Sequence, residues 1–268
     1  MTFAGSLKFA ARQLTPPLFW ALAKRVLGRT APPPATIVQP AANIKKEPWR
    51  GLTYQGVSTV HNALPMHEGQ FAQLYERYRP LDPLVPENVT RFRIYNLCWF
   101  ARQSAGLAGD FAVAGVSYGV APRVIYDFVN FPSLGKKFHF IDPFLAIKDT
   151  SERKVLPFYN NDPDYVVQQY PPDAPIVFHR VTIPDGLPLE GVEKLAFVHF
   201  NTGDHPSEAA ALPWFYERLT PNGAIVIDNY AINDGHFAIY DPVFRQLGVG
   251  PLWLPSGQCV IVKKGNRT

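Results

Sequence analysis

Cysteine is scarce in this sequence. The chain of 268 residues contains only Cys98 and Cys259, which are far apart and belong to no Cys-x-x-Cys motif. Two isolated thiols exclude a disulfide framework of the secreted type and a thiolate metal centre. The low cysteine content therefore favours a reducing compartment, and we expect a cytoplasmic location.

A long uninterrupted apolar segment is also lacking. The apolar residues near the N-terminus are interrupted by Arg12 and by the pair Pro16 and Pro17, and no small-residue cleavage site follows them. The run is too short to span a bilayer, and it does not have the pattern of a secretory signal peptide. We therefore predict neither a membrane span nor secretion.

The two common phosphate-binding fingerprints are missing as well. The sequence contains no G-x-G-x-x-G opening a helix after a strand, and no Gly-rich loop ending in Lys-Ser or Lys-Thr. Beyond residue 50 there is also no basic face with interleaved aromatic residues. Dinucleotide binding through a pyrophosphate cradle is therefore disfavoured, and nucleic acid is not expected as a partner.

What is present begins with a basic N-terminal extension. Residues 1–50 carry eight Lys or Arg residues against Glu47 alone, so their net charge is +7, whereas the whole chain carries +4 and the remainder is therefore −3. Within the extension, residues 15–30 combine apolar residues at helical spacing with three basic ones, and residues 31–48 form a proline-rich linker.

A basic amphipathic helix of this kind can lie in a membrane interface. We therefore expect peripheral contact with the inner face of a membrane through residues 1–30. The alternative is a helix that docks on the following domain, or on a second subunit of a homo-oligomer.

Residues 51–268 are expected to form one α/β domain, in which a helical lead-in (51–108) precedes a Rossmann-like core (109–264). Short apolar runs without alternation predict strands buried on both faces of a mostly parallel sheet, with helices on both faces and a C-terminal antiparallel hairpin. The predicted strands are Phe111–Gly115, Lys137–Ile141, Pro175–Val181, Leu195–Asn201, Ala224–Asp228 and Gln258–Lys263. The predicted helices are Asn62–Tyr78, Val89–Leu107, Pro122–Asn130, Ser207–Leu219 and Phe237–Leu247, and Pro213 should kink or shorten the fourth.

The stretch GDFAVAGVSYGVAP (Gly109–Pro122) predicts a strand, a glycine turn and a helix. Amides at such a turn can contact a ligand, and Asp142, at the end of the next strand, is placed to accept the two hydroxyls of a ribose. The alternative role for Asp142 is to cap the segment that follows it. Because the pyrophosphate fingerprint is missing, S-adenosylmethionine is the favoured nucleoside cofactor. Its expected contacts are Ala114, Gly115, Ser117, Tyr118, Gly119, Asp142, Pro143, Phe144 and Thr202.

The ordered motifs between Gly109 and Lys264 resemble the macrocin-type O-methyltransferases. The resemblance is carried by the G-V-x-x-G turn, the D-x-F after the second strand, LAFVHFNTGD and LTPNGAIVIDNY. It implies a class I S-adenosylmethionine-dependent methyltransferase that modifies a hydroxyl of a sugar or glycan-type small molecule. It also implies acids in the fourth- and fifth-strand motifs that bind a divalent cation.

The sequence departs from this family at three positions. Val113 stands where the family has a carboxylate before the turn, and Thr202 and Asn229 replace acids of the cation-binding motifs. Asp204 and Asp228 remain, so Asp204, Asp228 and Asn229 are the candidate ligands for Mg²⁺. Because Mg²⁺ prefers carboxylate oxygens, we expect any metal requirement to be weak.

Four residues are candidates for catalysis. Asp204 is predicted either to cap the next helix or to act in the site, and Asp228 lies at the sheet edge where open α/β folds bind ligands. His205 and His236, on loops at the same edge, could each take a hydroxyl proton near neutral pH, with simple surface exposure as the alternative. His139, His179 and His199 fall in or near strands and are expected to be structural.

The sequence thus predicts an O-methyltransferase that uses S-adenosylmethionine. A cofactor-binding protein that has lost catalysis is the main alternative. A nicotinamide oxidoreductase is a third hypothesis, disfavoured by the missing pyrophosphate fingerprint.

The extension generates a testable prediction. The full chain should float with anionic vesicles at low salt, because each basic residue near such a surface contributes about 1 kcal/mol of attraction. A truncated chain beginning at Trp49 should not float. Equal, salt-insensitive behaviour of the two chains would contradict membrane contact and favour the docking helix.

Overall fold

The computed structural model describes residues 52–54, 57–59, 64–82, 90–144, 162–231 and 234–265. The chain divides into two units, residues 1–49 and 50–268, and the described residues all belong to the second. The predicted N-terminal helix and linker lie outside them. Within the described part of the chain, no helix is both long enough and apolar enough to cross a membrane.

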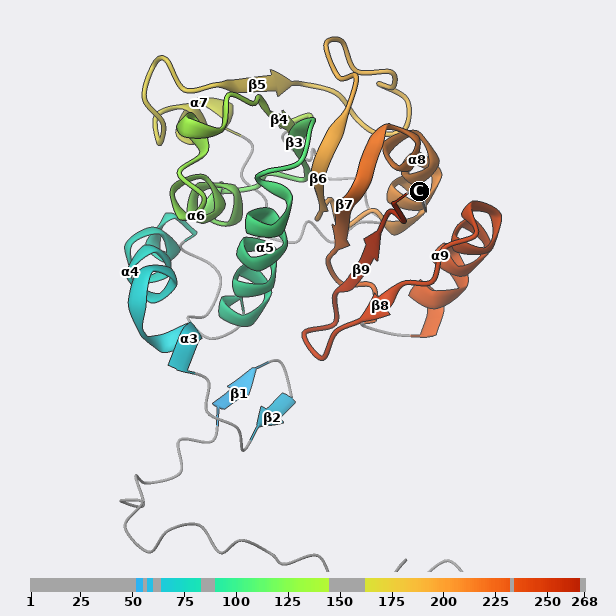
Figure 1. The fold of residues 1–268 in the computed structure, drawn as a ribbon, viewed down its shortest axis with the longest axis horizontal. Coiled ribbons are helices and arrows are strands. Elements are labelled where there is room, and N and C mark those ends of the chain that lie inside the picture. The colour runs from blue at the N-terminus through green and yellow to red at the C-terminus, as the bar shows by residue number, and fades with distance from the viewer. Residues whose placement is uncertain are drawn as a thin grey trace, which may run out of the picture. The chain divides into compact units, whose positions relative to one another are not determined.

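A seven-stranded sheet forms the centre of the described domain, in the order β5-β4-β3-β6-β7-β9-β8 (Figure 1). The first five strands in this order are parallel, while β9 is antiparallel to both β7 and β8. The bounds are β3 Asp110–Ala114, β4 Phe138–Ile141, β5 Ile176–His179, β6 Leu195–Phe200, β7 Leu219–Ile227, β8 Leu252–Trp253 and β9 Cys259–Val262. The predicted fold class and the terminal hairpin are confirmed.

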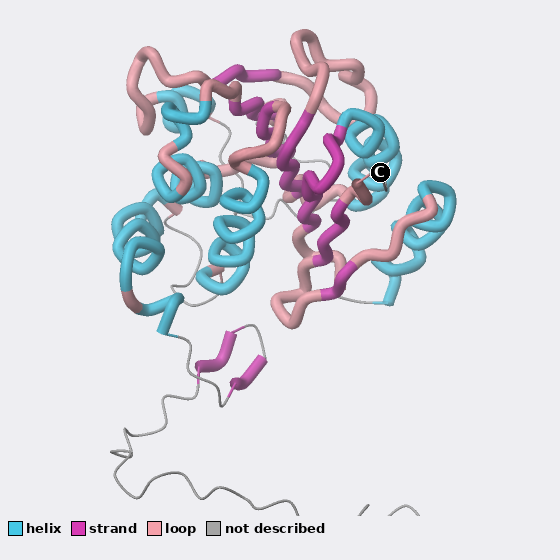
Figure 2. The backbone as a smooth tube through the Cα atoms, in the orientation of Figure 1, coloured by secondary structure: helices cyan, strands magenta, loops and turns pink. Residues whose placement is uncertain are grey.

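The strands lack polar alternation because helices cover both faces of the sheet, as Figure 2 shows. All six residues of β6 are buried, as a central strand of a parallel sheet requires. One face packs against α4 (Gly69–Tyr78), α5 (Arg91–Ser104) and α6 (Val120–Phe128), and the other against α8 (His205–Arg218) and α9 (Asp234–Leu247). The remaining elements are β1 Leu52–Tyr54, β2 Val57–Thr59, α3 Leu64–His67, α7 Pro163–Val167 and the short 3₁₀ helices Arg79–Leu81 and Phe131–Leu134.

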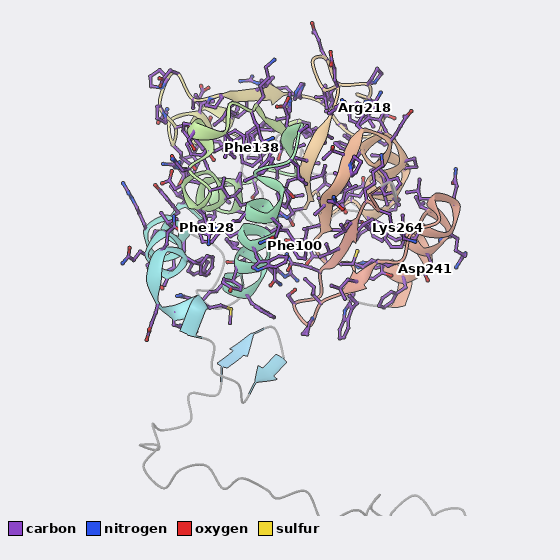
Figure 3. The ribbon with its side chains drawn as sticks, viewed as in Figure 1. Phe100, Phe128, Phe138, Arg218, Asp241 and Lys264 are labelled. Carbon is purple, nitrogen blue, oxygen red and sulfur yellow. The ribbon has the colours of Figure 1, made fainter. Side chains whose placement is uncertain are left out.

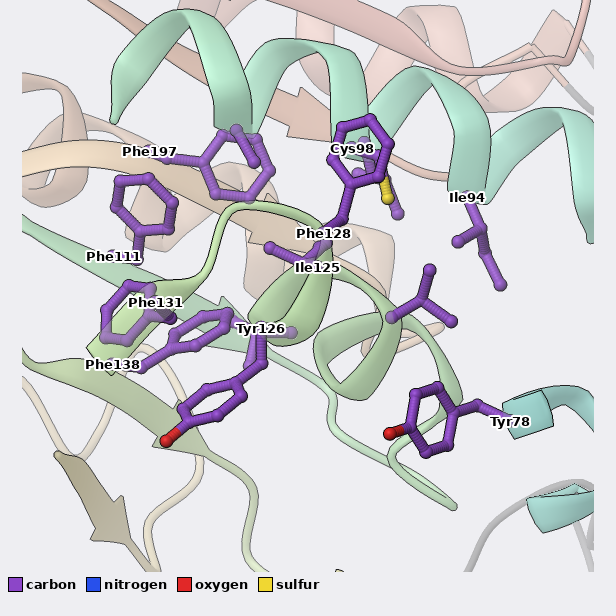
Figure 4. Close-up of a cluster of buried hydrophobic side chains, with 14 of the residues drawn as sticks. Tyr78, Ile94, Cys98, Phe111, Ile125, Tyr126, Phe128, Phe131, Phe138 and Phe197 are labelled. Atoms are coloured by element: carbon purple, nitrogen blue, oxygen red, sulfur yellow. The ribbon is translucent and has the colours of Figure 1, made fainter. Parts of the chain in front are cut away.

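Aromatic rings fill the first of these two cores. Phe111 of β3 packs at ring-centroid distances of 5.3 Å from Phe131, 5.9 Å from Phe138 and 5.3 Å from Phe197 (Figure 4). Figure 3 labels Phe138 of β4 and also Phe128 of α6, whose ring packs against Phe71 of α4. Full burial of such rings supplies the main driving force for docking the helices on the sheet.

Several features differ from the sequence prediction. The first helix is divided at Glu68 into α3 and α4, and β7 begins at Leu219, five residues before the predicted start. Pro213 does not shorten α8, which runs from His205 to Arg218 with the proline inside it. Proline removes one backbone hydrogen bond, but burial of the neighbouring Leu212 and Phe215 holds the helix against the sheet.

The topology determines where a ligand can bind. The chain enters the sheet at β3, adds β4 and β5 on one side, and then returns to place β6 and β7 on the other side of β3. The carboxyl ends of β3 and β6 therefore diverge into loops that run in opposite directions. Open α/β sheets bind their ligands at such a switch point.

Candidate functional site

The turn after β3 packs directly on the loop after β6. A Cβ atom built at Gly115 would lie 2.2 Å from the carbonyl oxygen of Asn201 and 2.6 Å from the amide nitrogen of Thr202. Gly115 also has a φ of +88°, which L side chains rarely adopt. Glycine is therefore required here by the close approach of two protein loops, whether or not a ligand is bound.

Asp142 closes this turn from the neighbouring strand. Its Oδ2 accepts hydrogen bonds from the amide of Val116 at 2.8 Å and from that of Ser117 at 3.3 Å, and its Oδ1 accepts one from the amide of Phe144 at 2.9 Å. The last bond is the capping interaction that was the alternative role for Asp142. A carboxylate has about four acceptor positions, so three bonds leave room for one hydroxyl.

The environment of Asp142 affects its charge. Burial raises the pKa of Asp142, while the three backbone N–H donors act in the opposite direction. The carboxyl group is thus held close to the turn amides in a position that water barely reaches.

The other residues expected to contact a cofactor lie around the same turn. Ala114 ends β3, Gly119 is the N-cap of α6, and Pro143 and Phe144 follow β4. The carbonyl of Tyr118 accepts a hydrogen bond of 2.9 Å from Gln169. These residues form one group at the carboxyl ends of β3 and β4.

Asp204 occupies the N-cap of α8. Its Oδ1 accepts a hydrogen bond of 3.4 Å from the amide of Ser207, and its carbonyl accepts one of 2.9 Å from the amide of Glu208. One of the two roles predicted for Asp204, the cap, is therefore present in the structure.

A buried carboxylate one turn further along α8 organises a second group. Glu208 is 1% exposed, and its Oε1 accepts hydrogen bonds from Thr202 N at 2.6 Å and Thr202 Oγ1 at 2.8 Å. Its Oε2 accepts one from the hydroxyl of Tyr240 on α9. His205 Nδ1 lies 3.1 Å from that hydroxyl and 3.6 Å from Glu208 Oε2.

The two histidines predicted as alternative bases lie together, but on helices and not on the predicted loops: His205 begins α8 and His236 is in the first turn of α9. The ring centroids of His205 and His236 are 3.9 Å apart, and His236 Nδ1 is 2.7 Å from the carbonyl oxygen of Asn229. That carbonyl can only accept, so His236 Nδ1 carries a proton. Asn229, after β7, thereby connects the histidines to the end of the sheet.

Asp228 lies on the face of the sheet that α5 covers. Its Oδ1 accepts a hydrogen bond of 2.7 Å from Gln258 Nε2 and lies 3.4 Å from His199 Nε2. Burial by itself would raise the pKa of Asp228, but the nearby His199 and Arg93 and the Gln258 hydrogen bond lower it below its usual value. Asp228 is therefore an ionised group surrounded by protein donors.

Arg93 on α5 supplies a cation at the same edge. Its Nη1 donates to Asn229 Oδ1 at 2.5 Å, and its Nε donates to the carbonyl oxygen of Ser256 at 3.2 Å. The guanidinium thus contacts Asn229, which stands at a position where the sequence resemblance implies an acidic metal ligand.

The residues present do not fit a magnesium site. Thr202 donates its hydroxyl proton to Glu208, Asp204 caps α8, and the side-chain oxygen of Asn229 accepts from Arg93. Only Asp204 and Asp228 supply carboxylates, and both already accept hydrogen bonds from the protein, whereas Mg²⁺ takes hard oxygen ligands in octahedral geometry. Within the described ranges, no group of three or more His, Cys, Asp or Glu side chains has a metal-binding arrangement.

Two of the three histidines in or near strands have hydrogen-bond partners. His139 Nε2 lies 3.2 Å from Asp110 Oδ2, and His139 Nδ1 lies 3.0 Å from His179 Nε2. His199 is 1% exposed beside Asp228. The contacts of His139 and His179 agree with the structural role expected of them.

Sequence reasoning missed Arg93, Glu208 and Tyr240. Glu208 carried a weak signal, because it lies four residues after a helix-capping aspartate and so faces the same edge. Arg93 and Tyr240 carried none, since each reaches the site only through the packing of α5 or α9.

Comparison with known proteins gives a fold. No protein-family model and no curated protein matches the chain. The structure of the O-methyltransferase NovP matches with a TM-score of 0.59 and 15% identity, over 73% of this chain and 97% of that one. The SAH-bound methyltransferase PaMTH1 of Podospora anserina matches with a TM-score of 0.49 and 13% identity, over 74% and 89%. Apo CalS11, a TDP-rhamnose 3'-O-methyltransferase, matches with 0.48 and 12%, over 71% and 93%.

The similarity to NovP establishes that this chain has the Rossmann-like methyltransferase fold. The sheet of this chain has the mostly parallel order and the antiparallel C-terminal hairpin already described.

The role of Asp204 as a cap can be measured. Asp204→Ala should lower the free energy of unfolding by about 1 kcal/mol, because the Ser207 amide loses its side-chain acceptor. Asp204→Asn should remain close to wild type, since asparagine caps as well as aspartate. Urea denaturation of the three chains checks this, and equal stability of the Ala variant and wild type would contradict the capping role.

Proposed function

We propose that this protein is an S-adenosylmethionine-dependent O-methyltransferase that acts on a hydroxyl group of a sugar or glycan-type small molecule. The observation that carries the proposal is the Asp142-closed turn at the switch point of a methyltransferase fold. The name of the structural neighbour NovP, an O-methyltransferase, supports the reaction class. The sugar acceptor rests on the sequence resemblance.

The turn suits a cofactor that is held through its nucleoside and amino-acid parts. The N-terminus of α6 follows Gly119, so its free amides favour a carboxylate of modest size. Asp142 keeps one acceptor position for a ribose hydroxyl. The missing pyrophosphate fingerprint disfavours the nicotinamide alternative.

The second group of residues would handle the acceptor. His205, His236, Asp228 and Asn229 lie at the carboxyl ends of β6 and β7, where the acceptor hydroxyl would face the cofactor turn. S-adenosylmethionine, when bound, supplies an electrophilic methyl group. The protein aligns the hydroxyl for in-line displacement and provides a base for its proton, and alignment alone can give much of the acceleration.

A cofactor-binding protein without catalysis remains the alternative in a different class. Such a protein would have the same cofactor turn as the enzyme. Only the residues around the acceptor therefore distinguish the two functions. The presence there of two histidines in ring contact, each with a defined hydrogen-bond partner, favours the enzyme.

Calorimetry tests the cofactor. S-adenosylhomocysteine should bind, and NAD should not, because the turn offers no pyrophosphate cradle. Asp142→Ala should weaken binding about tenfold, roughly 1.4 kcal/mol, because the turn loses its anchor and the ribose its acceptor. Asp173→Ala, which removes an exposed acid before β5, is the matched control. Wild-type affinity in a folded Asp142→Ala chain, or binding of NAD alone, would contradict the proposal.

Metal dependence gives a second test. Methyl transfer should survive exhaustive chelation, and Mn²⁺ should show no stoichiometric binding by electron paramagnetic resonance. The reason is that Asn229 and Thr202 are neutral and that the Arg93 guanidinium lies against Asn229. Loss of activity on chelation with recovery on adding Mg²⁺ would overturn this account of the site.

A further inference from the structure

The hydrogen bonds around Glu208 all run toward its carboxyl group. Thr202 N and Thr202 Oγ1 both donate to Oε1, and Tyr240 donates to Oε2. Three donors converging on a side chain that is 1% exposed is the pattern of an ionised carboxylate, which can only accept. Burial and the neighbouring Glu208 raise the pKa of Tyr240, so the phenol keeps its proton.

The direction of these hydrogen bonds also determines which nitrogen of His205 carries the proton. Because Tyr240 uses its one proton toward Glu208, its oxygen faces His205 Nδ1, 3.1 Å away, as an acceptor. Nδ1 must then carry a hydrogen. A neutral imidazole has a single N–H, so the lone pair is on Nε2.

We infer that Glu208 and Tyr240 are positioning residues that fix His205 in its Nδ1–H tautomer, so that Nε2 is the general base of the reaction. This inference rests on the proposed function for the identity of the reaction, but the tautomer itself does not. His236, whose ring centroid lies 3.9 Å from that of His205 at an interplanar angle of 44°, restricts the imidazole ring.

The chemical step balances with these groups. The acceptor hydroxyl gives its proton to His205 Nε2 while its oxygen forms a bond to the methyl carbon. The electron pair of the breaking carbon–sulfur bond returns to sulfur, leaving a neutral thioether. His205 becomes an imidazolium, and Glu208 Oε2, 3.6 Å from Nδ1, stabilises its charge.

Glu208→Gln provides a test that preserves shape. Thr202 N and Oγ1 require an acceptor, so the carboxamide oxygen should take the place of Oε1 and the NH₂ group should face Tyr240. Tyr240 must then accept from that NH₂, and its own proton turns to His205 Nδ1. The substitution therefore reverses the relay and should move the His205 proton to Nε2.

Nitrogen-15 NMR of histidine-labelled full-length protein reports the tautomer without any cofactor. The chain has seven histidines, and His205→Gln assigns the signals of His205. Wild type should show Nδ1 protonated and Nε2 as the lone-pair nitrogen, and Glu208→Gln should exchange the two. Tyr240→Phe should also abolish the Nδ1–H preference, whereas Tyr216→Phe, a tyrosine on α8 whose ring lies against Lys263, should leave it unchanged.

The outcomes separate this inference from the proposed function. An Nε2–H tautomer in wild type, or an unchanged tautomer in both the Glu208→Gln and Tyr240→Phe chains, would overturn the relay. A correct tautomer without methyl transfer would leave the relay standing and reject the reaction.

Where transfer is measured, Glu208→Gln should lower kcat at least tenfold and leave S-adenosylhomocysteine affinity unchanged. The pH profile of kcat should also lose the limb that reports His205, whose ring is faced by Glu208, Tyr240 and His236. A purely structural role for Glu208 would change stability and leave the pH profile unmoved.

Discussion

The close approach of the β3 and β6 loops is the constraint on which the site depends. The parallel ladder continues past the strand ends, with Gly115 N bonded to Ile141 O at 2.9 Å and Asn201 N bonded to Ala114 O at 2.8 Å. No side chain fits at Gly115, and Asp142 ties the turn to the neighbouring strand. This arrangement brings the turn residues next to Thr202, and Thr202 in turn contacts Glu208. The residues predicted to contact the cofactor and those predicted to contact the acceptor therefore lie on either side of the contact between the β3 and β6 loops.

The charges of the site are balanced by the protein itself. Asp228 is surrounded by His199, Gln258 and the field of Arg93, and Asn229 accepts from Arg93 where the sequence resemblance implies an acid. Unlike a bound metal ion, the guanidinium of Arg93 provides its positive charge without acidic ligands. It also orients its partners through several hydrogen bonds at once. At two positions where the sequence resemblance implies acids, this chain has Thr202 and Asn229, and Arg93 supplies the positive charge beside Asn229.

Much of the fold was predictable because burial on both faces leaves a strong pattern. The strands around Phe111, Phe138 and Phe197 read as apolar runs, and the glycine turn with Asp142 follows from local sequence. The site was harder, because its decisive contacts join distant positions: Arg93 meets Asn229 across 136 residues, and Tyr240 meets Glu208 across 32. Local sequence identified His205 and His236 as alternative bases but not that their rings are in contact. It also could not show that the carboxyl group of Asp142 holds the turn itself.

A crystal structure of the chain with S-adenosylhomocysteine tests the central claim most directly. The account predicts the ribose at the free acceptor position of Asp142 and the sulfur directed across the β3–β6 junction toward His205 Nε2. The site should hold no metal density between Asp228 and Asn229. Ligand bound away from the carboxyl ends of β3 and β4, or sulfur directed away from His205, would contradict it.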